Sequence, residues 1–106
     1  MDLEAKKKAL RRIVHGVYVV GVVDQGQLNA FTATWLTQVS FEPPLVVVGV
    51  RADGVSHKMI EASRVFVVNF LTTEQKSLAQ HFLKPAHLGE DKMAEIPHRV
   101  GQTGAP

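Results

Sequence analysis

The apolar positions near the start of the chain repeat with the spacing of a helix. Over residues 2–13, Leu3, Leu10 and Ile13 fall on one stripe, and five of the other positions carry lysine or arginine. From Gly16 the pattern changes to GVYVVGVVD, a run of β-branched and aromatic residues that favours a strand over a helix. The start of the chain therefore predicts a basic helix followed by an apolar strand.

Turn residues divide the next part of the chain into further strands. The sequence DQGQ, in which Gly26 can take positive φ, separates the first strand from a second that we expect over residues 29–35. Pro43 and Pro44 have no backbone N–H for a strand ladder, so FEPP ends this region before a third strand over residues 45–51.

Shorter elements follow in the second half of the chain. ADG is another turn, and it leads into VSHKMIEAS, a predicted short helix that offers Met59 and Ile60 to the core. Residues 64–71 (RVFVVNFL) are nearly all apolar, so we expect a fourth strand that is buried on both faces. TTEQKSLAQHFL predicts another helix, in which Thr72 and Gln75 match a capping box.

The periodic pattern fades after Leu83 into a stretch with Pro, Gly and charged residues. The predicted order is helix, strands, helix, strand, helix, within a single domain that covers residues 1–106. Neighbouring strands with short turns are typical of an antiparallel sheet or a small barrel with helices at its ends. The predicted fold class is therefore mainly β with α, and the choice between an open antiparallel sheet and a β-barrel stays open at this point.

Composition removes several kinds of function. Hydrophobic residues make up 45% of the 106 positions and charged residues 21%, which is typical of a folded globular protein. The sequence has no cysteine, which excludes disulfides, thiolate zinc sites and cysteine nucleophiles. Its five histidines show no paired helical spacing, so we expect no metal site.

The net charge of the chain and the length of its apolar runs indicate which partners and which cellular compartment to expect. The net charge of +2 and the sequence pI of about 9.2 fit an anionic small molecule better than a nucleic acid. The basic run KKKALRR could contact nucleic acid, but a solvated helix face is the simpler explanation because no second basic cluster follows. The longest apolar run, residues 17–23, is too short to span a bilayer, and no signal-peptide pattern is present. We therefore expect a cytoplasmic protein with no nucleic-acid and no membrane partner.

One segment carries more hydroxyl groups than a buried strand needs. Thr32, Thr34, Thr37 and Ser40 surround the lone tryptophan, Trp35. In a strand Thr32 and Thr34 share one face, and we expect the chain to loosen after Trp35. Exposed backbone N–H groups and hydroxyls in a loosened segment can hydrogen-bond a flat polar heterocycle or receive phosphate oxygens.

A second group of polar residues lies at the start of the predicted helix near Ser56. Such a start offers unpaired N–H donors and the positive end of the helix dipole. Arg51 could pair with a phosphate through a forked, charge-assisted contact, and His57 and Lys58 lie nearby in the sequence. The two stretches together could hold a phosphorylated aromatic ligand. The plainer alternative is that the threonines face solvent, Trp35 anchors a core and Ser56 only caps its helix.

No side chain is arranged for nucleophilic or general-base catalysis. Asp24, Asp53 and Asp91 lie in turn-like contexts, and no Ser–His–Asp order can be identified. The chemistry of an enzyme built on this chain would therefore belong to a cofactor, with the protein supplying position and electrostatics.

Two long segments resemble a known family. NAFTATWLTQVSFEPPLVVVGV, followed by SHKMIEASRVFVVNFLTTEQKSLAQHF, is similar to the flavin reductase-like family of FMN-binding split barrels. The family patterns A-S/T-W-x-S/T-x-V/A/T-S-x-x-P-P, F-x-V-N-x-L and L-A-x-x-F occur here in order, within a match from about Leu10 to Phe82. FLKPAHLGEDKMAEI also resembles the linker in the flavin reductase-like modules of diflavin flavoproteins.

The resemblance implies a six-stranded Greek-key split barrel that forms a homodimer, with flavin bound near the subunit interface. It implies FMN, or FAD in its place, as the cofactor and NAD(P)H as the co-substrate that passes hydride to the flavin. The cofactor-binding residues that it implies are Thr32, Ala33, Thr34, Trp35, Gln38, Val39, Ser40, Ser56 and His57, and charge adds Arg51 to them.

The sequence also departs from the family. Members continue with further strands that complete the barrel, whereas this chain stops at Gly104-Ala105-Pro106. We therefore expect a barrel that is incomplete at its C-terminal side, with open strand edges that favour pairing with another chain. The preferred function is an NAD(P)H-dependent flavin reductase, and the alternative is a non-catalytic flavin-binding or assembly module. NADH oxidation that depends on added flavin distinguishes them. Nucleic-acid binding through the basic helix is a weaker third option.

Overall fold

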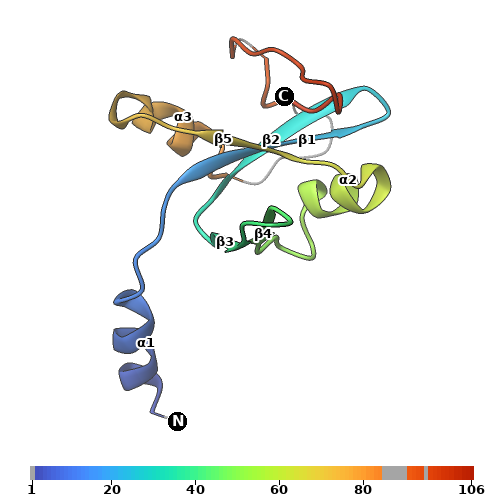
Figure 1. The fold of residues 1–106 in the computed structure, drawn as a ribbon. Coiled ribbons are helices and arrows are strands. Elements are labelled where there is room, and N and C mark those ends of the chain that lie inside the picture. Colours follow the sequence, from blue (N-terminus) through green and yellow to red (C-terminus); the bar gives the residue numbers. More distant parts are fainter. Residues whose placement is uncertain (1, 85–90, 95) are drawn as a thin grey trace.

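A computed structural model describes residues 2–84, 91–94 and 96–106 of the chain (Figure 1). Its elements follow the predicted order, except that an additional strand follows Trp35 and a 3-10 turn precedes the last helix. The elements are α1 (Leu3–Arg11), β1 (Tyr18–Asp24), β2 (Gln27–Ala33), β3 (Leu36–Ser40), β4 (Leu45–Val48), α2 (Val55–Ser63), β5 (Val67–Phe70), η1 (Thr73–Gln75) and α3 (Lys76–His81).

A three-stranded antiparallel sheet in the order β2–β1–β5 forms the centre of the fold. The β1–β2 hairpin closes at the pair Asp24 and Gln27. Both residues between them have positive φ, 49° at Gln25 and 81° at Gly26. Two central residues of positive φ give the turn whose twist matches that of the flanking strands. The turn predicted at DQGQ is therefore confirmed, and it fixes the register of β2 on β1.

Both faces of β1 are buried, each against a different part of the chain. Val20 and Val22, which are 0% exposed, pack with Met59 of α2. Val19 on the opposite face packs with Phe82, which follows α3. The helix predicted at VSHKMIEAS is confirmed, and it supplies Met59 to the core as expected.

The predicted capping box begins the turn before α3. The backbone N–H of Thr72 donates to Oε1 of Gln75 at 2.8 Å, and the reciprocal contact to the Thr72 side chain is also present. This start directs α3 so that Leu78 and Phe82 both pack into the core cluster around Val19. The end of α3 is thereby held beside the sheet.

The segment after Trp35 is a strand, so the expectation of a loosened chain is wrong. β3 pairs with β4 in a separate two-stranded sheet, with an irregular register between Gln38 and Ser40. Strand pairing satisfies the backbone N–H and C=O groups while the polar side chains remain in solvent, so polar composition did not prevent it. The side chains of this hairpin are largely exposed, as at Leu45 (50%) and Val47 (54%).

The fourth predicted strand is not buried on both faces. β5 lies at the edge of the central sheet, where it pairs with β1, and Phe70 at its end is 79% exposed. The Phe70 ring meets the Tyr18 ring edge-on, with centroids 5.8 Å apart. An apolar sequence favours a strand, but its position in the sheet decides how much of it is covered.

The sheets are not closed into a barrel over the described residues. β2 and β5 are the outer strands of the central sheet, and the β3–β4 hairpin forms a sheet of its own (Figure 1). A barrel needs every strand to have a neighbour on both sides. The described part of the chain is therefore a mixed α/β fold with two open sheets, and its open strand edges agree with the expectation of an incomplete barrel.

α1 stands apart from the rest of the described chain (Figure 1). The Asp2 carboxylate caps it by accepting a hydrogen bond from the Glu4 N–H at 2.9 Å. None of its residues is buried, and Leu3 and Leu10 are exposed. The helix prediction is confirmed, but the apolar stripe of α1 covers no core.

Candidate functional site

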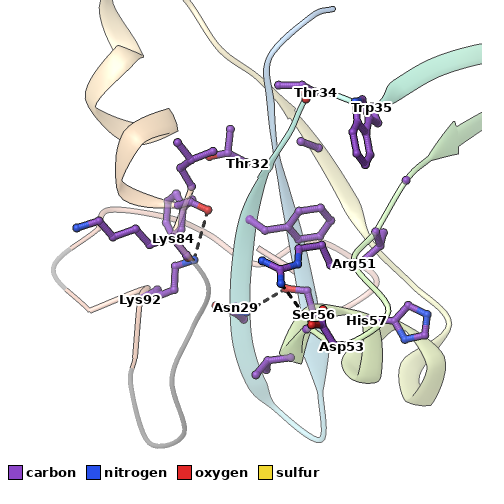
Figure 2. Close-up of a pocket in the computed structure, with 18 residues that line it drawn as sticks. Asn29, Thr32, Thr34, Trp35, Arg51, Asp53, Ser56, His57, Lys84 and Lys92 are labelled. Carbon is purple, nitrogen blue, oxygen red and sulfur yellow. Dashed lines mark hydrogen bonds and ion pairs between the residues drawn. The ribbon is translucent and has the colours of Figure 1, made fainter. Parts of the chain in front are cut away.

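A cavity of about 370 Å³ opens beside β2, the outer strand of the central sheet (Figure 2). Its volume lies in the range of small-molecule sites. Four stretches meet there: β2 with the two residues after it, the connection from β4 into α2, the residues after α3, and Lys92. The lining residues are Asn29, Phe31, Thr32, Ala33, Thr34, Trp35, Gly49, Val50, Arg51, Asp53, Gly54, Val55, Ser56, His57, Phe82, Leu83, Lys84 and Lys92.

Most of the predicted ligand-binding residues come together in this cavity. Those that line it are Thr32, Ala33, Thr34, Trp35, Arg51, Ser56 and His57. Gln38, Val39 and Ser40 lie on β3, outside the lining. The structure therefore brings the two predicted stretches together, and ligand contact at each residue stays a prediction.

The hydroxyl groups around Trp35 differ in what they do. The Thr32 hydroxyl donates to the carbonyl of Ala79 at 2.5 Å, so its proton is committed to α3. Its oxygen can still accept a hydrogen bond. Thr34, where β2 has ended, is exposed at the cavity, and Trp35 is 68% exposed. Thr34 therefore has the hydroxyl that is better placed to meet a ligand.

The indole of Trp35 is held close to the backbone of Gly49. The Gly49 N–H donates to the Trp35 carbonyl at 2.7 Å. A Cβ at position 49 would come within 3.2 Å of the indole atom Cε3, which is tighter than ordinary van der Waals contact. The glycine therefore leaves room for the indole at this part of the cavity rim.

The start of α2 supplies donors on another side of the cavity. Its N-cap residue is Gly54, which has no side chain that could accept a hydrogen bond from the first N–H groups of the helix. The first N–H groups of a helix have no partner within it, and they carry partial positive charge. The buried Ser56 hydroxyl accepts from Nδ2 of Asn29 at 3.1 Å, which leaves its own proton to donate. These groups suit an anion or a polar ring edge.

The charged side chains near α2 are partly paired with one another. Nη2 of Arg51 lies 3.3 Å from Oδ2 of Asp53, and both side chains are exposed. Nδ1 of His57 lies 3.2 Å from Oε1 of Glu61, one helical turn away. An incoming phosphate would have to compete with Asp53 for Arg51. The predicted forked contact from Arg51 is therefore weaker than its charge alone suggests.

Sequence reasoning missed two lysines that line the cavity. Lys84 is exposed, whereas Lys92 is only 5% exposed, and its ammonium donates to the carbonyls of Phe82 (3.3 Å) and Lys84. Both lie in the stretch after Leu83, where no periodic pattern indicated an element. Asn29 and Phe82 were also missed, because each looks like an ordinary strand or helix residue.

The described part of the chain contains neither a candidate membrane-spanning helix nor a cluster of potential metal ligands. None of its helices has the length and apolar character needed to cross a membrane. Nor do the described residues contain a cluster of three or more His, Cys, Asp or Glu side chains able to hold a metal ion.

The sequence matches known proteins over nearly its whole length. The model of the family described as Flavin reductase like domain matches residues 10–106. Diflavin flavoprotein A 1 from Synechocystis is 32% identical over 106 residues, which cover 99% of this chain and 18% of that protein. The chain therefore spans less than a fifth of this relative.

Two solved structures have similar folds. The NADH:FAD oxidoreductase of Streptomyces globisporus superposes with a TM-score of 0.87 at 31% identity, over 99% of this chain and 63% of that chain. An FMN-binding protein from Thermus thermophilus gives a TM-score of 0.80 at 29% identity, over 90% of this chain and 53% of that one. In both cases the matched region is less than two thirds of the solved chain.

Proposed function

Because the chain belongs to the flavin reductase-like domain family, we propose that it binds a flavin in the cavity between β2 and α2. The observation that carries this proposal is the meeting of Thr34 and Trp35 with the start of α2 at one cavity. These residues offer a hydroxyl, an aromatic surface and a helix start, which together suit a flat heterocycle that bears a phosphate.

In this proposal the ring and the phosphate occupy different parts of the cavity. The ring lies near Ala33, Thr34 and Trp35, where a hydroxyl and an indole are exposed. The phosphate lies at the start of α2, where Ser56 and His57 contribute side chains to the cavity lining. Bound flavin would supply a hydride acceptor, which no side chain of this chain can replace.

The residues on β3 have a secondary place in the proposal. Gln38 and Ser40 are joined by a hydrogen bond from Nε2 of Gln38 to the Ser40 carbonyl, at 3.4 Å, and Val39 between them is exposed. Since they lie outside the cavity lining, they would contact only a part of the ligand that extends beyond Trp35. We expect smaller effects from them than from Thr34.

The preferred activity is reduction of FMN, or of FAD, by NAD(P)H. The matched oxidoreductase of Streptomyces globisporus is named for NADH and FAD, and the Thermus thermophilus protein for FMN, which supports both cofactors. The non-catalytic alternative is favoured by one observation. The described sheets are open and Trp35 is largely exposed, so water is poorly excluded from the place proposed for the ring.

A second chain would complete the site in this proposal. The β3–β4 hairpin exposes the apolar residues Val39, Leu45, Val46 and Val47. Exposed apolar strands favour pairing or packing with another chain. A homodimer that covers this hairpin would also shield Trp35, and further strands could close the open sheets into a split barrel.

Titration of the purified chain with FMN tests the proposal first. Fluorescence quenching and the visible spectrum of the flavin should show saturable binding at a micromolar Kd or tighter, about −8 kcal/mol or better. NADH oxidation that requires added flavin would then establish the reductase, and binding without turnover would favour the non-catalytic module. A folded chain that binds neither FMN nor FAD would refute both.

A further inference from the structure

Four residues fasten the edge of β2 to the end of α3, and we call them the α3 latch: Thr32, Ala79, Phe82 and Lys92. The Thr32 hydroxyl donates to the Ala79 carbonyl at 2.5 Å, and the Thr32 N–H donates to the Phe82 carbonyl at 3.0 Å. Nζ of Lys92 donates to the same Phe82 carbonyl at 3.3 Å, and to the carbonyl of Lys84. Donors from two distant parts of the chain therefore converge on the residues that end α3.

The chemistry of a helix end explains why these donors are there. The last carbonyls of a helix have no partner within it, and they carry partial negative charge. Lys92 brings a buried positive charge to that end, and its ammonium also lies 5.7 Å from the centroid of the Phe82 ring. Burial of an ammonium is costly unless its protons are hydrogen-bonded. The bonds to the Phe82 and Lys84 carbonyls offset that cost.

The latch also forms one side of the cavity. Thr32, Phe82, Lys84 and Lys92 all line it, and Figure 2 shows Lys84 and Lys92 together, away from Trp35 and His57. Phe82 in addition lines a second cavity of about 290 Å³. Since the buried Phe82 lines both cavities, a shift of its ring would change the shape of the first one.

We propose that Lys92 is a positioning residue, which holds the end of α3 against β2 and so keeps the flavin cavity in its binding shape. Its described hydrogen bonds point to backbone carbonyls of the cavity side, so it acts through Phe82 and not through the ligand's phosphate. The part of this inference that concerns flavin affinity rests on the proposed function, whereas the part that concerns the latch does not.

Amide hydrogen exchange of the chain without flavin tests the latch by itself. The Thr32 amide is bonded to the Phe82 carbonyl, so it reports whether the end of α3 is in place. Lys92→Met should speed exchange at Thr32 by about tenfold or more relative to wild type, and should change exchange at Val20 and Val22 much less. A general loss of stability would instead speed all these amides together, and it would overturn the proposal.

Flavin binding tests how the latch acts on the cavity. FMN and riboflavin differ by the phosphate, so a positioning residue should weaken both equally. We expect Lys92→Met to raise both Kd values by the same factor, roughly tenfold. Loss of affinity for FMN alone would mean that Lys92 binds the phosphate directly, and unchanged affinity for both would mean that the latch does not shape the cavity. Either result would overturn the proposal.

Two further variants keep the test decisive. Lys76→Met removes an exposed lysine from the opposite end of α3, and it should leave Thr32 exchange and both affinities unchanged. If Lys92→Met does not fold, Lys92→Gln can replace it, because glutamine keeps a donor without the charge. We expect it to speed Thr32 exchange and to raise both Kd values, each by less than Lys92→Met would. If wild type itself binds no flavin, the proposed function fails, and exchange at Thr32 alone decides whether Lys92 holds α3.

Discussion

Two strands of nearly the same composition lie in opposite environments. YVVGVVD in β1 contains Val20 and Val22, which are fully buried, whereas Val46 and Val47 in the LVVV of β4 are about half exposed. β1 has β2 and β5 on its two sides and α2 packed on one face, but β4 pairs only with β3 among the described residues. An apolar sequence therefore forms a strand in both places. Only β1 belongs to the core, because other strands and α2 cover it.

Because of this difference, the region that stabilises the fold is largely distinct from the hairpin beside the proposed binding site. Both core clusters of the described residues are formed mainly by the central sheet and α2, together with Phe82 and Met93 from the chain after α3. The β3–β4 hairpin contributes to these clusters only through partly buried residues at its ends, Leu36 and Val48. The proposed flavin site lies where the two regions meet, with Thr32 fixed to the core side and Trp35 on the exposed side.

The largest effect should come from removing bulk in β1. Val22→Ala leaves a cavity in the core and should lower the free energy of unfolding by roughly 2–3 kcal/mol. The matched change Val46→Ala in β4 should cost less than about 1 kcal/mol, because Val46 is already half exposed. Urea unfolding followed by circular dichroism measures both. Equal losses of unfolding free energy in the two variants would mean that another chain covers the hairpin in solution. The loss in Val46→Ala would then vary with protein concentration.

A second contrast concerns two glycines, each packed closely by another part of the chain. A Cβ at Gly21 in β1 would clash with the backbone oxygen of Pro106, so that residue must move. A Cβ at Gly49 would meet both Cβ and Cε3 of Trp35 at 3.2 Å, a milder overlap in which the exposed indole can turn away and Cβ has to give only slightly. We expect Gly21→Ala to destabilise the chain by roughly 1–2 kcal/mol and Gly49→Ala by less than about 1 kcal/mol.

The fluorescence of the only tryptophan distinguishes these two variants further. Gly49→Ala should change the emission of Trp35, whereas Gly21→Ala should not until the chain unfolds. Thermal unfolding and emission spectra of the two purified variants provide the comparison. An unchanged Trp35 emission in Gly49→Ala would contradict the close contact between the indole and this glycine.

Local sequence signals predicted the elements well, and they failed where burial depends on distant residues. The turn at Gly26 and the capping box at Thr72 are each specified by a few adjacent residues, and both are confirmed. The exposure of Phe70 was predicted wrongly, because it depends on β5 lying at a sheet edge. The incomplete barrel was expected from the family resemblance and not from the strand patterns, because closure depends on pairing between strands.

The candidate site was predictable to a similar extent. The hydroxyl-rich segment and the start of α2 each carry a local chemical signal, and the fold brings Thr34 and Ser56 to one cavity. Lys92 carries no such signal, because a lysine in an irregular stretch looks like a solvated residue. Its burial arises from tertiary contacts with Phe82 and Lys84, which sequence patterns do not encode.

The third prediction compares hydroxyls on the two sides of Trp35. Thr34→Val removes an exposed hydroxyl that lines the cavity, and it should weaken FMN binding by about fivefold, or about 1 kcal/mol. Ser40→Ala, on β3 outside the lining, should change the Kd by less than about twofold. Flavin fluorescence titration measures both. A larger loss of FMN affinity from Ser40→Ala than from Thr34→Val would mean that the ligand binds on the β3–β4 hairpin.

The smallest effect is expected in α1, the region most separate from the core. Leu10 is exposed, no residue of this helix is buried, and its first turn is fixed locally by Asp2. Leu10→Gln keeps a similar helix propensity, so it should change the free energy of unfolding by less than about 0.5 kcal/mol. Urea unfolding at two protein concentrations provides the measurement. A clear loss of stability, greater at the higher concentration, would mean that the apolar stripe of α1 packs on another chain. Like the β3–β4 hairpin, α1 would then be a surface that is covered only in an assembly.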